Sequence, residues 1–423
     1  MIDTNLIRRP ISQDVCWEEL GKAKLRKPFD ADSIQFCQLL SQSLLRPAIT
    51  SAFPELAALG FWLRKSNLMS IAESVSMEVH KNGTKHYVNP RGTVFHIAPA
   101  NVDTIFVYSW ILSLLCGNRN LIRLSSKTSP QLSTLLQLID EILCLESSSQ
   151  IRQSIAMVQY ERSEEITARL CEAIDVRIIW GGDDTVNAIR KIPVPPTATE
   201  ACFPNKVSFA CIDVKSWRQI SSGQKHEVAS AFVKDAYPFL QSACSSPRGL
   251  VWVGENVDSA EKESFWQLVL EVLRRESFEF SDIDFVDKRI ACDIAATQFP
   301  IRVPFDGDNR LVRIVISPDD FRKGIESELH CGRGLFFETN LASLMELPDQ
   351  LSRKTQTVSY LGFEQGELSQ LLEVSALGGI DRIVPFGRAL DFSHMWDGIN
   401  LLDVFLRTTT FAQTYTSSRP TVV

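Results

Sequence analysis

Residues Gly92-Thr-Val-Phe-His-Ile-Ala98 form a short apolar run, and Pro99-Ala-Asn101-Val-Asp103 follows it as a turn. From this point onward, short apolar segments typical of strands alternate with segments whose apolar residues have helical spacing. Strands and helices that alternate in this way favour a parallel sheet covered on both faces. The sequence therefore predicts an α/β domain of a nucleotide-binding type. Its predicted strands are 92–98, 121–124, 155–159 and 176–180, and its predicted helices are 104–117, 129–144 and 164–173.

A second α/β unit is predicted after the proline-rich connection Ile192-Pro-Val-Pro-Pro196. It alternates strands and helices as the first one does, which again indicates a parallel sheet. Its predicted strands are 207–213, 249–253, 311–317 and 335–338, and its predicted helices are 227–237, 259–275, 319–329 and 364–377.

The two ends of the chain differ from this pattern. The first part is predicted to form helices and then a hairpin that turns at Asn82-Gly83. The last part is predicted to hold an exposed strand over 407–415, and an exposed edge strand favours a partner that covers it. We therefore predict a helical layer and hairpin (1–91), a nucleotide-binding domain (92–206), a catalytic domain (207–386) and a C-terminal segment that is a candidate oligomerisation arm (387–423).

The composition argues against several classes of function. The chain has 423 residues and a net charge of −7, whereas nucleic-acid binding calls for basic stripes. Its ten cysteines include no CxxC pair and its six histidines are dispersed, so neither a metal site nor a disulfide framework is expected. The start lacks an apolar signal region, and the longest apolar run, 104–116, is shorter than the roughly 20 residues of a membrane span. We expect a reduced, cytoplasmic protein without an integral membrane segment.

The stretch Gln241-Ser-Ala-Cys244-Ser-Ser-Pro247 places a thiol in a small polar turn between a predicted helix and a predicted strand. A thiol in such a turn stays accessible to substrate, whereas a cysteine on a buried strand face is inert. Most cysteines are simply small core residues. The interpretation of Cys244 as a nucleophile that carries an acyl group therefore depends on the motifs elsewhere in the chain.

One of these motifs is Asn101, just past the end of the strand 92–98. An amide fixed in that position can donate to a substrate oxygen and stabilise an oxyanion, an effect of about 3 kcal/mol where measured. The simpler alternative is that Asn101 satisfies the turn or caps the next helix.

Two further motifs follow strand ends, the side of a parallel sheet where ligands bind. Arg123 and Lys127 could hold a phosphate, assisted by the hydroxyl groups of Ser125 and Ser126, although a solvated strand end would carry the same residues. The pair Gly181-Gly182 lies between a strand and a helix, which suits close approach of a cofactor to the backbone. No G-x-G-x-x-G is present, so an ordinary dinucleotide fingerprint is missing.

Taken in order, these motifs resemble the aldehyde dehydrogenase superfamily, and within it the long-chain fatty acyl-CoA reductase family best known from bacterial bioluminescence. Pro99 to Asp103 lies where the superfamily has Pro-Trp-Asn-Phe-Pro, and Cys244 in Ala-Cys-Ser-Ser-Pro lies where the reductases have their nucleophile. The resemblance implies an aldehyde dehydrogenase-like fold with a small oligomerisation element, and it gives Asn101 the oxyanion-holding role. It runs from about Gly92 to Arg407. Further matching segments are 117–126, 180–182, 330–334, 356–358, 381–387 and 396–398.

Two departures from the superfamily pattern bear on the chemistry. Members that oxidise aldehydes use the Glu of Glu-Leu-Gly-Gly-Lys to activate water, and Cys202 stands there in this chain. Without a positioned base, hydrolysis of a thioester should be slow, unless the segment aligns two residues earlier and Glu200 is the base. In the ribose-binding strand, Arg123 replaces the family Lys and Ser126 the family Glu. Loss of that carboxylate favours NADP over NAD.

The resemblance thus implies NADPH-dependent reduction of a fatty acyl thioester, carried by CoA or by an acyl-carrier protein, to the aldehyde through an acyl group on Cys244. An acyl-transferring partner enzyme and, from the exposed strand, a homo-oligomer are expected with it. Three alternatives stay open, because function must be argued from the site. They are an aldehyde dehydrogenase acting oxidatively, a cysteine acyltransferase or acyl carrier without hydride transfer, and a scaffold that kept only the fold.

Overall fold

The structure is a computed structural model and describes residues 20–75, 78–81, 84–99, 102–127, 129–276, 278–304, 308–374 and 379–412. Contacts within the chain gather it into two compact units. Unit 1 takes in Met1–Pro204 and Phe392–Val423, and unit 2 takes in Asn205–Asp391. The assignment of nucleotide binding and catalysis to separate domains stays a prediction.

Unit 1 is built on a five-stranded parallel sheet in the order β5-β4-β3-β6-β7. This confirms the predicted parallel α/β architecture. Its strands are β3 (Thr93–Ile97), β4 (Arg119–Leu124), β5 (Ile155–Gln159), β6 (Val176–Trp180) and β7 (Thr199–Phe203).

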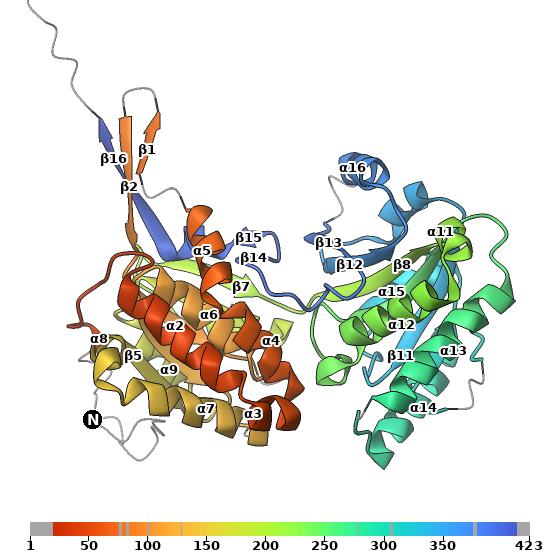
Figure 1. Cartoon of the computed structure of the whole chain (residues 1–423), viewed down its shortest axis with the longest axis horizontal. Helices are drawn as coiled ribbons and strands as arrows, with labels where there is room; N and C mark the ends of the chain where they lie inside the picture. The colour runs from red at the N-terminus through yellow and green to blue at the C-terminus, as the bar shows by residue number, and fades with distance from the viewer. Residues whose placement is uncertain are drawn as a thin grey trace, which may run out of the picture. The chain divides into compact units, whose positions relative to one another are not determined.

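Helices cover both faces of this sheet because successive side chains of each strand enter different cores. Val94 of β3 belongs to a core shared with α2, α6 and α7, whereas Phe95 belongs to one shared with α9 and α10 (Figure 1). The helices of unit 1 are α2 (Ala31–Leu44), α3 (Pro47–Ala52), α4 (Pro54–Trp62), α5 (Lys65–Glu73), α6 (Ile105–Leu115), α7 (Pro130–Leu143), α8 (Ser149–Gln153), α9 (Glu164–Cys171), α10 (Asp183–Arg190) and α17 (Leu401–Phe405), with a 3₁₀ turn η2 (Glu146–Ser148).

Helix α6 is the central helix of unit 1, and every residue after Ile105 is buried. Its end is fixed by Gly117, as the sequence predicted. This glycine has a φ of 86°, and a Cβ there would lie 2.2 Å from the carbonyl oxygen of Arg26. Only glycine fits both the left-handed backbone and the close approach.

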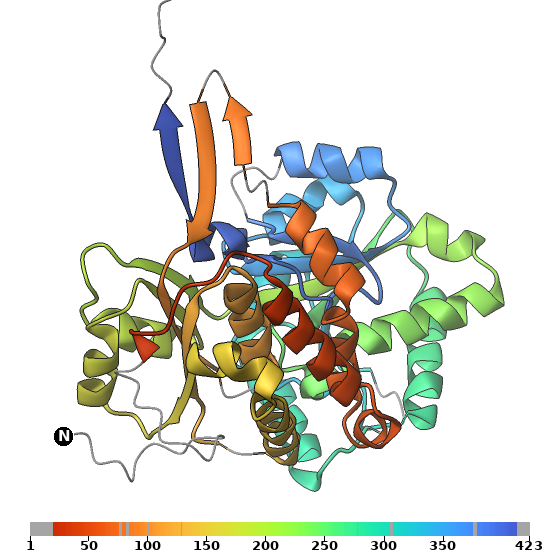
Figure 2. The same cartoon turned by 60° about the vertical axis from the view of Figure 1, so that its left-hand side comes forward.

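Three antiparallel strands form a second, small sheet in unit 1: β1 (Glu78–Lys81), β2 (Thr84–Pro90) and β16 (Leu406–Ala412). The pairing of β1 with β2 confirms the predicted hairpin, although Asn82-Gly83 lie outside the described residues. Strand β16 pairs with β2 and forms the edge of the sheet. Both views show these strands standing away from the parallel sheet of their own unit (Figure 2). Two short strands, β14 (Met395–Trp396) and β15 (Ile399–Asn400), pair nearby in sequence.

Unit 2 holds a six-stranded parallel sheet in the order β10-β11-β9-β8-β12-β13. Its two faces have separate cores, one with α15 and part of α14, the other with α12 and α13. The strands are β8 (Val207–Asp213), β9 (Pro247–Val253), β10 (Val312–Val315), β11 (Leu335–Leu341), β12 (Thr355–Leu361) and β13 (Arg382–Pro385). The helices are α11 (Val214–Gln219), α12 (Ser222–Ala236), α13 (Ser259–Arg275), α14 (Asp282–Gln298), α15 (Pro318–Glu326) and α16 (Gln365–Val374), with 3₁₀ turns η3 (Pro238–Gln241) and η4 (Leu344–Gln350).

Two features are missing from the described part of the chain. None of the helices there is both long enough and apolar enough to cross a membrane. Nor do three or more His, Cys, Asp or Glu side chains gather there in a way that could hold a metal ion.

Candidate active site

Cys244 lies in the turn between η3 and β9, at the amino end of a central strand of unit 2. The residue is half-buried and takes part in no disulfide. The turn between a helical segment and a strand is as the sequence predicted, and its small side chains leave the thiol partly exposed. The geometry suits a nucleophile that must meet a substrate.

The backbone of Cys244 is held by the neighbouring strands. The Ser208 hydroxyl, at the start of β8, donates a 2.7 Å hydrogen bond to the Cys244 carbonyl oxygen. The same hydroxyl accepts a 3.1 Å bond from the backbone N–H of Thr357 in β12. Because Ser208 and Thr357 are both buried, these bonds form away from competing water and keep the peptide of Cys244 in one orientation.

The half-buried guanidinium of Arg248, four residues after Cys244, interacts with the thiol through its charge. Burial lowers the pKa of the Arg248 guanidinium, and the charge of a Cys244 thiolate acts in the opposite direction. The guanidinium donates a long hydrogen bond of 3.4 Å to the carbonyl oxygen of Ile325. A positive charge beside a cysteine favours its thiolate, the form that attacks carbonyl groups.

The ring of His330, in the loop before β11, is bound by backbone groups. Burial, with the charge of Arg248, lowers the pKa of its ring to about 3, so the imidazole is neutral at neutral pH. Its Nε2 lies 2.9 Å from the carbonyl oxygen of Leu335, and its Nδ1 accepts a bond from the N–H of Gly332. Both ring nitrogens therefore bind backbone groups and hold the loop that precedes β11.

In unit 1 the predicted ligand-binding segments follow the carboxyl ends of the parallel strands. From β3 the chain moves outward to β4 and β5, and then crosses to β6 on the other side of β3. The order of the strands thus reverses between β3 and β6, and ligands of open α/β sheets bind at such a point. The segment after β3 and the pair Gly181-Gly182 after β6 flank it, and residues 125–127 follow the neighbouring β4.

At the end of β4, Arg123 and Ser125 form hydrogen bonds within the protein, whereas the next two side chains are exposed. The Arg123 guanidinium packs over the Tyr160 ring at 4.7 Å and donates to the Tyr160 carbonyl oxygen at 3.3 Å. The Ser125 hydroxyl accepts a 3.1 Å bond from the N–H of Lys127. The side chains of Ser126 and Lys127 are exposed. A hydroxyl group and an ammonium group are thus available here for an anion.

At the end of β6, Gly182 is the N-cap of α10 and offers no side-chain cap. The first turn of this helix carries Asp183 and Asp184, and their negative charge opposes the attraction that a helix N-terminus has for phosphate. Gly181 lies close to Thr185, since a Cβ at Gly181 would be 3.1 Å from its methyl group. Of the two predicted anion contacts, the donors after β4 suit a phosphate better.

Asn101, the predicted oxyanion donor, lies outside the described residues. Asp103, two residues later, has a clear structural role: its carboxylate accepts a hydrogen bond from the Ser129 hydroxyl, which also accepts from the N–H of Leu132 to cap α7. The turn after β3 is thereby joined to the start of α7.

The segment that replaces the water-activating glutamate is β7. Burial, with the neighbouring Glu200, raises the pKa of the Cys202 thiol to about 11, so it is protonated at neutral pH. The Glu200 carboxylate accepts hydrogen bonds from Arg177 at 2.6 Å and from Arg190 at 3.0 Å. Both oxygens of this carboxylate are therefore engaged by guanidinium groups.

Solved structures share this fold along most of the chain. An oxidoreductase from Marinobacter aquaeolei matches with a TM-score of 0.65 at 10% identity, over 96% of this chain and 94% of its own. A mutant 1-pyrroline-5-carboxylate dehydrogenase from Thermus thermophilus matches with a TM-score of 0.65 at 13% identity, over 94% and 84%. Betaine aldehyde dehydrogenase from Staphylococcus aureus, solved with NAD+, matches with a TM-score of 0.62 at 12% identity, over 90% and 81%. The fold is that of the aldehyde dehydrogenases.

The sequence identifies one particular family among the proteins that share this fold. Residues 70–281, half of the chain, match the model of the acyl-CoA reductase (LuxC) family. The chain belongs to this family, and the matched segment contains every predicted site residue from Asn101 to Cys244. The long-chain acyl-protein thioester reductases of Photorhabdus luminescens and Vibrio harveyi are 24% and 22% identical over 308 residues, which is 70% of this chain. The chain spans 58% and 59% of the length of these two relatives.

Proposed function

We propose that the protein reduces a long-chain acyl thioester to the aldehyde, with Cys244 carrying the acyl group and NADPH as the reductant. The observation that carries the proposal is the half-buried Cys244 in a turn held by Ser208, and the charge of Arg248, which interacts with the thiol, supports it. Membership of the acyl-CoA reductase family and the names of the thioester reductases support the substrate class.

In the proposed first step the Cys244 thiolate attacks the thioester carbonyl carbon, a C–S bond forms, and the C–S bond to the donor thiol breaks. The donor leaves as a thiolate and takes a proton from solvent. The Asn101 amide and the Cys244 backbone N–H are proposed to hold the oxyanion. In the second step the acyl carbon gains a hydride, its bond to Sγ breaks, and the aldehyde leaves with the Cys244 thiolate restored.

NADPH, when bound, would supply that hydride. The residues after β4 fit its 2′-phosphate: Lys127 is exposed, Ser126 is exposed and uncharged, and Arg123 lies on the same strand end. Gly181-Gly182 would allow close backbone approach at the point where the strand order reverses. These residues are proposed to bind the cofactor and exclude its NAD counterpart, which lacks the phosphate.

The acyl-enzyme should resist water long enough to be reduced. A protonated Cys202 thiol is a poor general base, and both oxygens of the Glu200 carboxylate are engaged by Arg177 and Arg190. This supports reduction over the oxidative alternative, in which the acyl group would be hydrolysed.

The acyl donor is proposed to be acyl-CoA or an acyl-carrier protein, supplied by an acyl-transferring enzyme. Among the described strands β16 pairs only with β2, and its free edge there supports the further proposal of a homo-oligomer. A cytoplasmic location is proposed from the unpaired cysteines of the described residues.

The test follows NADPH oxidation by absorbance with tetradecanoyl-CoA, comparing the wild type with Cys244→Ala. Aldehyde should form in equal amount to the NADPH consumed, and the substitution should abolish both. Acylation of Cys244 without NADPH oxidation would instead identify an acyl carrier. Turnover that survives in Cys244→Ala would refute the proposed nucleophile.

A further inference from the structure

The side chain of Gln241 closes the turn that carries Cys244. Its Nε2 donates hydrogen bonds to the carbonyl oxygens of Pro247 at 2.7 Å and Leu335 at 3.1 Å. Its Oε1 accepts a 2.9 Å bond from the N–H of Gly334. The amide is only 3% exposed, so all three bonds are sheltered from water. The bond from Gln241 to Pro247 makes a closed ring of residues 241–247 with Cys244 at its middle.

The two segments joined by Gln241 both have unusual backbones. Phe239, Leu240 and Gln241 have φ angles of 55°, 49° and 63°, and Gly332, Arg333 and Gly334 have 74°, 59° and 85°. Non-glycine residues adopt this left-handed region at a cost, and they stay there only where their surroundings hold them. Three such residues directly before the Cys244 turn therefore need an external restraint.

The segments restrain each other. The N–H of Arg333 donates a 2.9 Å bond to the carbonyl oxygen of Leu240. A Cβ at Gly332 would lie 2.7 Å from that same oxygen, so only glycine permits the approach. The Cys244 turn thus packs on residues 332–335 through one backbone bond and two bonds from the Gln241 side chain.

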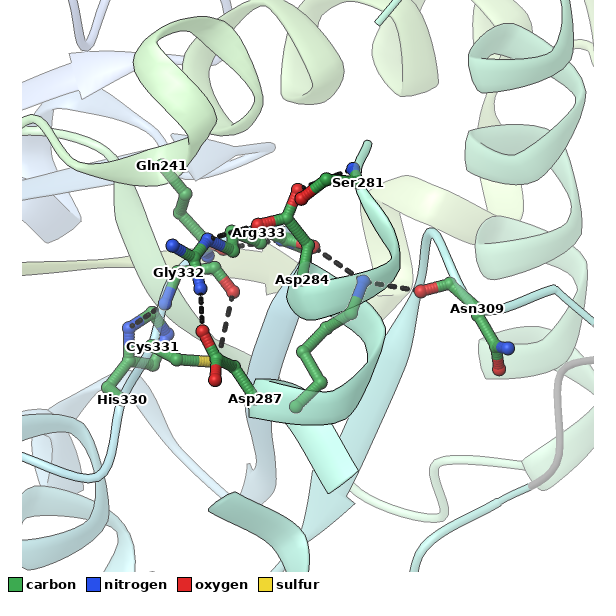
Figure 3. A network of polar contacts seen from close by, with 11 residues as sticks. Gln241, Ser281, Asp284, Asp287, Asn309, His330, Cys331, Gly332 and Arg333 are labelled. Carbon is green, nitrogen blue, oxygen red and sulfur yellow. Dashed lines mark hydrogen bonds and ion pairs between the residues drawn. The ribbon is translucent and has the colours of Figure 1, made fainter. Parts of the chain in front are cut away.

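Residues 332–335 are in turn fixed to helix α14. Arg333 forms ion pairs with Asp284, at 2.7 Å, and with Asp287, and its carbonyl oxygen accepts a 2.7 Å bond from Lys288. Figure 3 shows Gln241 close to the segment of Gly332 and Arg333, with Asp284 and Asp287 of α14 reaching toward the Arg333 guanidinium. Lys288 is fully buried. The contact between residues 332–335 and α14, which supports the Cys244 turn, is therefore rigid.

We propose that Gln241 is a positioning residue for Cys244, which holds the thiol at the point from which it attacks the acyl carbonyl. A nucleophile reacts fast only when held about 3–3.5 Å from its target in the correct direction. Without the Gln241 bonds, the turn would keep a chemically normal thiol but would seldom present it in that place. The effect on acyl transfer rests on the proposed function, whereas the effect on the turn does not.

The test uses the full-length protein with Gln241→Met, which keeps the length of the side chain but cannot donate or accept as the amide does. Thr339→Val is the matched control, because it removes one buried hydrogen bond, to the Ile316 carbonyl oxygen, from the same sheet. Three quantities are measured: CoA release from tetradecanoyl-CoA without NADPH, alkylation of Cys244 by iodoacetamide, and amide hydrogen exchange in residues 242–247.

For Gln241→Met we expect CoA release to slow at least tenfold, alkylation to stay within about threefold, and exchange in 242–247 to rise; Thr339→Val should change none of these. Unchanged CoA release or unchanged exchange in Gln241→Met would overturn the proposal. Equal losses in the control would do the same. If Cys244→Ala still releases CoA, the proposed function fails, and the exchange measurement alone decides the role of Gln241.

A second variant covers the case that Gln241→Met does not fold. Gln241→Glu keeps an acceptor for the N–H of Gly334 but, when ionised, loses the bonds to Pro247 and Leu335. Its neutral acid can donate one of them, so CoA release relative to the wild type should recover as the pH falls. A ratio that does not change with pH would count against positioning by these bonds.

Discussion

Ser208 and Cys244 are joined by a 2.7 Å hydrogen bond from the serine hydroxyl to the carbonyl oxygen of the cysteine. Ser208 lies at the start of β8, and its hydroxyl also accepts from the N–H of Thr357 in β12. One buried hydroxyl therefore ties the thiol-bearing turn to two strands on one side, while Gln241 ties it to β11 on the other. The turn that carries the thiol is thus held from two sides by hydrogen bonds.

Ser208→Ala should reduce acylation of Cys244 about tenfold and lower the free energy of unfolding by roughly 1–3 kcal/mol. The loss arises because the carbonyl oxygen of the half-buried Cys244 and the buried N–H of Thr357 lose their partner. CoA release and urea denaturation measure the two effects. The control is Ser359→Ala, since the Ser359 hydroxyl is buried in β12 and has no hydrogen-bond partner among the described residues. Acylation at the wild-type rate in Ser208→Ala would show that this bond does not matter.

Arg248→Met should move the pH dependence of Cys244 alkylation to higher pH, because the guanidinium no longer stabilises the thiolate. The rate of iodoacetamide labelling, followed by mass spectrometry from pH 6 to 10, measures this. Arg322→Met serves as the control, since Arg322 makes the same long 3.4 Å bond to a backbone carbonyl oxygen, that of Leu351. Superimposable profiles for the wild type and Arg248→Met would show that Arg248 does not stabilise the Cys244 thiolate.

The buried carboxylate of Asp235 should make stability depend on pH. It accepts bonds of 2.8 Å and 2.9 Å from the N–H groups of Gly387 and Ala389, and burial raises its pKa to about 7. Between the unfolded value of about 4 and 7, the folded state holds a proton that the unfolded state has lost. The stability linked to this proton is present in full below about pH 4 and is lost as the pH rises to about 7.

We therefore expect the wild type to lose stability relative to Asp235→Asn as the pH rises through this window. The loss amounts to about 1.4 kcal/mol for each unit by which the pKa is raised. Urea denaturation of both proteins between pH 4.5 and 8 measures the difference. Two curves that run parallel across this range would mean that Asp235 titrates as an ordinary exposed carboxyl.

The sequence predicted eight of the eleven strands of the two parallel sheets because they are apolar runs, but it missed β7, β12 and β13 and the helix α14. Strand β12 is central, yet Thr355, Gln356, Thr357 and Ser359 are all buried in it. Its polar residues thus hide the usual signal of a buried strand. Helix α14 reverses the usual pattern, because Lys288 points inward while Ile283 and other apolar residues are exposed.

The candidate site likewise has one part that the sequence could predict and one part that it could not. The turn of Cys244 was predictable, since it depends on local residue types between a helix and a strand. The contacts of Gln241 were not, because their partner segment lies about ninety residues further along the chain. Gln241 begins the stretch 241–247 that the sequence singled out for its thiol, but only tertiary structure gives its amide a role. Asn101 stays a prediction.

Glu200→Gln should lower the free energy of unfolding by roughly 1–3 kcal/mol without changing hydrolysis of the acyl-enzyme. The buried Arg177 guanidinium loses its charged partner, but no water-activating base is lost. Glu263→Gln, which removes a partner of the buried Arg313 in unit 2, is the control for stability. Release of myristic acid from acylated protein measures hydrolysis. Slower release in Glu200→Gln would revive the oxidative alternative.

Ser126→Glu should change the preference between the two nicotinamide cofactors. It places a carboxylate at the exposed end of β4, near Lys127, where it would repel a 2′-phosphate and could bind a free 2′-hydroxyl. We expect the KM for NADPH to rise about tenfold, a loss of roughly 1.4 kcal/mol, while the KM for NADH stays equal or falls. Steady-state rates with tetradecanoyl-CoA measure both constants.

Ser133→Glu is the control for this prediction. It adds the same charge to an exposed position on α7, so it separates a local effect from a change in net charge. An equal rise in both KM values would place the phosphate elsewhere, and an NADPH preference that survives unchanged would show that residues 125–127 do not contact the ribose.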